Sequence, residues 1–227
     1  MARSVLVQIA RGNYFYLLFS LLLLLLLAPL FQETFIGSIM VDIAYTAVLL
    51  SAAYAVSEKR RLFTLTLVLV VLILAARWSS DFLSNDSLAL ASKTLTLVFL
   101  GFIVCAMLSH VLKDEEVTAN KICGALSVYL LIGVTWAVLF TVIEGIRPQS
   151  FLIADVQGAS IREISTHFTY YSFVTLTTLG YGDITPLTPT AKAFSFVEAV
   201  FGQIYLAVLI ARLVGLHIAH SMKKDSS

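Results

Sequence analysis

Six apolar runs divide this 227-residue chain, and each approaches the length that a helix needs to cross a lipid bilayer. About 20 apolar residues in helical form span the hydrocarbon core of a membrane. The runs are Tyr14 to Phe31, Phe35 to Val56, Leu62 to Trp78, Leu88 to Leu112, Ile122 to Ile143, and Lys192 to Ile218. They predict an all-α membrane protein with six transmembrane helices.

The composition excludes the soluble classes of protein. Apolar residues make up 59% of the chain and charged residues only 13%, whereas soluble domains carry about 25% charge. The net charge of +1 offers no concentrated basic face, so we expect no nucleic-acid partner. Cys105 and Cys123 both lie in or beside apolar runs and indicate no disulfide framework, which leaves the redox compartment open.

Basic residues are concentrated on one side of the predicted spans. That side carries Arg3, Arg11, Lys59, Arg60, Arg61, Lys113, Lys121, Lys223 and Lys224, and the other side has fewer. Because cytoplasmic loops are enriched in Lys and Arg, we expect both termini to be cytoplasmic in a plasma (cell inner) membrane. The first run imitates a signal peptide, but its length and the lack of a small-residue cleavage motif favour a retained helix.

One connection is much longer than the others. Glu144 to Pro189 separates the fifth and sixth runs and contains the stretch Ile164 to Leu179, which is too short and too rich in threonine to span. Irregular backbone at membrane depth is tolerated only where protein buries it or where it lines a watery cavity. The sequence therefore predicts a re-entrant segment and a pore between helices 5 and 6.

The segment Thr177-Thr178-Leu179-Gly180-Tyr181-Gly182-Asp183 resembles the selectivity-filter signature of tetrameric potassium channels of the six-transmembrane, one-pore type. The resemblance implies that Thr166 to Thr177 form a short pore helix and that Asp183 lies at the outer mouth. It also implies K⁺ binding by carbonyl oxygens that replace the hydration shell of the ion. Leu179 departs from the family's usual Val or Ile. The implied ion-binding filter comprises Thr178, Leu179, Gly180, Tyr181 and Gly182, with K⁺ held at the first four.

Glycine suits such a filter for a physical reason. Consecutive carbonyls that point at one axis require a backbone of alternating handedness, which Gly180 and Gly182 adopt at little cost. We expect the Tyr181 ring to point away from the ion path and to support the strand against the pore helix.

One stripe of the sixth run would line the cavity and the intracellular gate if the resemblance holds. At 100° per residue the stripe contains Gln203, Leu206, Ile210, Val214 and His217. If His217 faces the lumen, its charging near pH 6–7 would oppose conduction, but we favour a solvated helix terminus as the explanation of this residue. Gly202 is either a hinge or a site of close packing.

Two ionisable residues of the sixth run lie on the side away from this stripe. For Glu198 we expect a hydrogen bond behind the filter. For Arg212 we expect contact with headgroups or with a neighbouring helix.

These expectations give a four-helix, voltage-sensor-like peripheral domain over 1–115 and a pore domain over 116–227. The implied protein is a homotetramer in the lipid bilayer that conducts K⁺ passively and has no cofactor. Voltage dependence should be weak, because helix 4 carries only Lys93 in place of a ladder of arginines.

Two alternatives remain open. The first is a non-conducting membrane scaffold. The second is a Gly-x-Gly-Asp intramembrane aspartyl protease that would pair Asp183 with Asp42. Against the protease, Pro186 and Pro189 follow Asp183 and are expected to end a helix there.

Overall fold

A computed structural model describes residues 13–31, 35–55, 60–83, 86–111, 118–153 and 161–225. Each of the six apolar runs coincides with a helix whose ends differ from those of the run by at most seven residues, and a further short helix precedes the segment Thr177 to Asp183. The helices are α2 (Asn13–Phe31), α3 (Phe35–Ala55), α4 (Arg60–Leu83), α5 (Asp86–Val111), α6 (Ala119–Ile146), α7 (Ile161–Leu176) and α8 (Pro189–Asp225).

Within the described ranges, three segments are long and apolar enough to cross a membrane: Ser87–Val111, Asn120–Ile146 and Pro189–Arg212. Three shorter apolar helices precede them: Tyr14–Leu30, Ile39–Ala55 and Thr64–Ser79. The helical class of the fold is therefore as expected, and three of the six expected spans reach full length.

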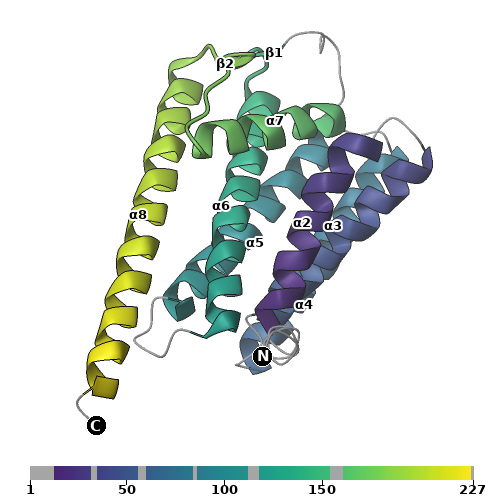
Figure 1. The fold of residues 1–227 in the computed structure, drawn as a ribbon. Coiled ribbons are helices and arrows are strands. Elements are labelled where there is room, and N and C mark those ends of the chain that lie inside the picture. The colour runs from purple at the N-terminus through teal and green to yellow at the C-terminus, as the bar shows by residue number, and fades with distance from the viewer. Residues whose placement is uncertain are drawn as a thin grey trace.

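Helix α6 occupies the middle of the molecule (Figure 1). Helices α2 and α5 both pack against it, and α3 and α4 complete a bundle around α2 and α5. Through α2 and α5, the first four helices therefore pack against α6 of their own chain. Helix α8 stands at one side of the molecule (Figure 1), and most of its apolar surface is exposed in the single chain.

An ion pair and an aromatic ring tie three peripheral helices together. Arg77 on α4 donates to the carboxylate of Asp42 on α3, and its guanidinium lies 4.6 Å from the centre of the Tyr45 ring. The Tyr45 hydroxyl lies 3.1 Å from the Thr96 hydroxyl on α5. Asp42 thus has a basic partner that the sequence analysis did not assign to it.

Two strands of three residues were not part of the all-α expectation. Strand β1 (Phe151–Ile153) pairs antiparallel with β2 (Ile184–Pro186), with Ile153 opposite Ile184.

The expectation that both Pro186 and Pro189 end a helix was wrong for Pro189, which is the first residue of α8. Proline is tolerated there because the first N–H groups of a helix have no intrahelical partner. The Thr188 hydroxyl accepts from the Ala191 N–H at 3.3 Å.

Candidate functional site

The short helix α7 lies across the half of α6 nearest the two strands (Figure 1). It begins at Ile161, five residues before the expected start, and ends at Leu176. Phe168 and Tyr171 of α7 pack against Phe140 of α6 and Phe151 of β1, with ring centroids 4.7 to 6.2 Å apart. Edge-to-face pairs of this kind stabilise beyond their buried area, so this aromatic cluster fixes α7 in place.

The chain after α7 has the backbone that the motif predicts. Gly180 and Gly182 have φ angles of +58° and +79°, and Thr178 has a φ of +62°. Left-handed conformations therefore occur at every second residue from 178 to 182. The glycines adopt them readily, whereas at Thr178 this conformation costs about 1 kcal/mol or more. The sequence analysis missed the strained threonine, because its residue type does not indicate a positive φ.

Backbone hydrogen bonds attach this segment to the end of α7. The Leu179 and Gly180 N–H groups both donate to the carbonyl oxygen of Val174, at 2.9 and 3.3 Å. One carbonyl oxygen of α7 thus accepts from two consecutive amides of this segment. In the single chain all residues from Thr177 to Asp183 are exposed to solvent.

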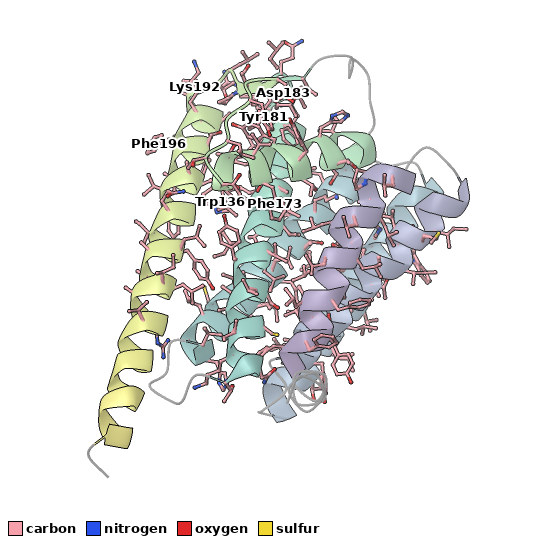
Figure 2. The ribbon with its side chains drawn as sticks, viewed as in Figure 1. Trp136, Phe173, Tyr181, Asp183, Lys192 and Phe196 are labelled. Carbon is pink, nitrogen blue, oxygen red and sulfur yellow. The ribbon has the colours of Figure 1, made fainter. Side chains whose placement is uncertain are left out.

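Tyr181 and Asp183 lie at the same end of the molecule as the two strands (Figure 2). The Tyr170 hydroxyl on α7 donates to Oδ2 of Asp183 at 2.7 Å. This hydrogen bond lowers the pKa of Asp183 and raises the pKa of Tyr170. The Tyr181 side chain is 67% exposed, so its support of the strand stays a prediction.

Glu144, the third residue from the end of α6, holds the chain that follows that helix. Its carboxylate accepts hydrogen bonds from the N–H groups of Gln149, Ser150 and Phe151, at 2.6, 2.9 and 3.1 Å. Because Phe151 begins β1, which pairs with the strand after the filter, Glu144 helps to place the outer end of the filter. A single glutamate before a loop gave no signal for this role.

The expected cavity stripe of α8 lies largely on its uncovered side. Gln203, Ile210 and Val214 are exposed in the single chain, and Leu206 is half-buried. His217 belongs to α8, but its side chain lies outside the described part of the structure.

Gly202 is buried on another side of α8, against the end of α7. A Cβ atom there would lie 2.3 Å from the Leu176 carbonyl oxygen. Close packing therefore explains this glycine without a hinge.

The two ionisable residues of α8 face the interior of the chain, as the helical wheel predicts. Glu198 is fully buried, with Oε1 at 2.5 Å from the Ser172 hydroxyl oxygen of α7. Arg212 donates to the carbonyl oxygen of Val111, the last residue of α5, at 2.5 Å. Lys93 of α5 donates to the Ser165 hydroxyl of α7 at 2.6 Å. These contacts connect α5, α7 and α8 to one another.

The structure does not bring the two aspartates of the protease alternative into one shared site. Asp42 pairs with Arg77 in the peripheral bundle, and Asp183 accepts from Tyr170 beside the filter segment. A catalytic aspartate dyad requires two carboxyl groups that share one proton, and here each carboxylate has its own donor.

Residues 151–217 match the sequence model of a family described as ion channel. The match covers β1, α7, the filter segment and the greater part of α8. Together with the long apolar helices, this match indicates a membrane channel rather than an enzyme.

Similar curated proteins come from plants. Two-pore potassium channel 5 of Arabidopsis thaliana is 47% identical over 45 residues, which cover 20% of this chain and 11% of that protein. Two pore potassium channel c of Oryza sativa subsp. japonica is 47% identical over 45 residues, 20% of this chain and 10% of that protein.

Two-pore potassium channel 4 of Arabidopsis thaliana is 44% identical over 70 residues, 31% of this chain and 24% of that protein. The chain thus spans at most about a quarter of the length of these relatives. No solved structure matches the chain.

Proposed function

We propose that this protein conducts K⁺ passively and selectively across the plasma membrane, through a filter formed by Thr178 to Gly182. The observation that carries the proposal is the alternating left-handed backbone at Thr178, Gly180 and Gly182, on a segment hydrogen-bonded to the end of α7. Such a strand can present successive carbonyl oxygens to an ion in place of water. The similarity to plant potassium channels supports K⁺ as the ion.

The working unit in this proposal is a homotetramer. One chain supplies one filter strand, and coordination of an ion on all sides requires four. The exposure of the filter segment and of apolar α8 residues supports this assembly, because a neighbouring copy would cover both. The exposed α8 residues include Phe196, Phe201 and Ile204.

In this assembly the stripe from Gln203 to His217 lines the cavity and gate, and Asp183 attracts cations at the outer mouth. Helices α2 to α6 and α8 are the six spans, with both termini in the cytoplasm. Within the described residues, α2 begins and α8 ends at the same end of the molecule (Figure 1), which agrees with an even number of crossings.

The proposal is tested with purified protein in liposomes. We expect K⁺ and Rb⁺ flux to exceed Na⁺ flux strongly, and a detergent-solubilised particle of about 100 kDa of polypeptide, four chains of 24.9 kDa. Replacing Tyr181 by Asp should remove the support of the strand and erode selectivity. Comparable Na⁺ and K⁺ permeability, or a conducting monomer, would contradict the proposal, and a complete lack of flux would favour the scaffold alternative.

A further inference from the structure

Glu198 is a fully buried carboxyl group in the part of α8 that contacts α7. Its Oε1 lies 2.5 Å from the Ser172 hydroxyl oxygen, and that oxygen lies 2.7 Å from the carbonyl oxygen of Gly133 on α6. Three helices therefore meet along one chain of three oxygen atoms. The close approach of α6 and α7 at this point depends on glycine, because a Cβ at Gly133 would lie 2.7 Å from the Phe173 ring.

The number of protons shared by these three oxygen atoms determines whether Glu198 is protonated or ionised. A backbone carbonyl only accepts hydrogen bonds, and the Ser172 hydroxyl has a single proton to donate. If Ser172 donates to Gly133, the proton between Ser172 and Glu198 has to come from the glutamate. If Ser172 donated to an ionised Glu198 instead, two oxygen atoms would face each other at 2.7 Å without a proton between them.

The surroundings of Glu198 also oppose a charge. Its second oxygen, Oε2, is buried and makes no hydrogen bond within the described part of the chain. Among the described residues, the titratable groups that interact with it are the phenols of Tyr129 on α6 and Tyr171 on α7, and the latter donates its own proton to Ser195. The described basic residues make no ion pair with it. A buried carboxylate without a cation is strongly unfavourable.

We propose that Glu198 is a neutral carboxylic acid that donates through Ser172 to Gly133, and that this proton chain positions the filter. The link to the filter is short: two residues after Ser172, the Val174 carbonyl oxygen accepts from the Leu179 and Gly180 amides. Glu198 is thus a positioning residue that acts through α7. Its effect on selectivity rests on the function proposed above, whereas its protonation state does not.

Infrared spectroscopy of the full-length protein in liposomes tests the protonation state directly. We expect the difference spectrum of wild type minus E198Q, at neutral pH, to show the C=O stretch of a protonated carboxylic acid. The S172A variant should shift that band, because Ser172 accepts the proton. Loss of a carboxylate band in E198Q, with no acid band in the wild type, would overturn the proposal, whether or not the protein conducts.

Flux measurements test the positioning role. E198Q replaces the acid by a neutral donor and should keep the K⁺-over-Na⁺ ratio of the wild type, whereas E198M removes the donor and should lower the ratio about tenfold. S195A is the matched control, since it removes another buried α7–α8 hydrogen bond, from Tyr171, without removing a titratable group.

The flux outcomes separate the two proposals. Equal ratios in E198M and wild type would overturn the positioning role, as would an E198Q variant as damaged as E198M. If wild type itself showed no selectivity, the proposed function would fail while the infrared result stood.

Discussion

Gly202 of α8 lies directly against the carbonyl group of Leu176, the last residue of α7: a Cβ atom at position 202 would lie 2.3 Å from that oxygen. The obstacle is backbone, which cannot rotate away as a flexible side chain can. Helix α8 and the end of α7 are therefore in contact just before the proposed filter segment begins.

Replacing Gly202 by Ala should separate α8 from α7 and destabilise the channel by about 1–3 kcal/mol, as overpacking does in other cores. The measurement is the thermal stability of the solubilised assembly together with K⁺ flux. Gly215→Ala is the control on the same helix, because a Cβ there meets nothing within 4 Å in the single chain. Equal behaviour of the two variants would contradict the packing role of Gly202.

The hydrogen bond from Tyr170 should determine how external acid affects the channel. Because it lowers the pKa of Asp183, the carboxylate keeps its charge at a lower pH than an ordinary aspartate does. In Tyr170→Phe the pKa of Asp183 should rise toward its usual value, so acid should reduce single-channel conductance from a higher pH. Tyr171→Phe is the control, since that hydroxyl bonds to Ser195. Identical acid titrations of wild type and Tyr170→Phe would refute this role.

The helices were predictable from sequence, and the contacts between them were not. The apolar run Phe35 to Val56 matches α3 nearly residue for residue, since spanning length and hydropathy act locally along the chain. The ion-pair partner of Asp42 is instead Arg77, which lies 35 residues away on another helix and which no local pattern indicates. The two short strands were also not predicted, because three residues are too few to show the alternation of apolar and polar residues that indicates a strand.

The backbone at Gly180 and Gly182 was the most predictable part of the candidate site, because glycine is the residue type that adopts a positive φ at little cost. Gly180 and Gly182 have the expected positive φ angles. The residues that hold the filter were harder to find. Glu144 and Tyr170 act through donors and acceptors that lie on other segments, and no pattern in the sequence pairs them.

Voltage should change the open probability only weakly. In the described part of α5 the single lysine or arginine is Lys93, and it donates to Ser165 of α7. A full elementary charge that crosses the membrane gains about 2.3 kcal/mol per 100 mV, and channels with arginine ladders move about three to four such charges per subunit. Lys93→Gln should leave a shallow conductance–voltage slope unchanged. A steep slope that this variant abolishes would show that Lys93 is a sensing charge.

Arg212 should couple α8 to the peripheral bundle through the end of α5. Its guanidinium donates to the Val111 carbonyl oxygen, one of those left free at the end of a helix. Arg212→Met keeps the apolar stem but loses this bond, and should destabilise the assembly by about 1 kcal/mol in a thermal denaturation assay. Lys192→Met, an exposed change on the same helix, should have a smaller effect. The reverse order of stability would contradict the coupling.

In the proposed tetramer, the attachment of the filter segment at both ends would affect the free energy of subunit association. The Val174 carbonyl holds its inner end, and the pairing of Ile184 with Ile153 holds its outer end, both within one chain. Ordering a free backbone costs about 1–2 kcal/mol per residue. Here that entropy is lost when each subunit folds, so subunit association has less disorder left to remove. Four such strands would meet as pre-organised surfaces, so less of the free energy of their contacts would be offset by ordering of the backbone during subunit association.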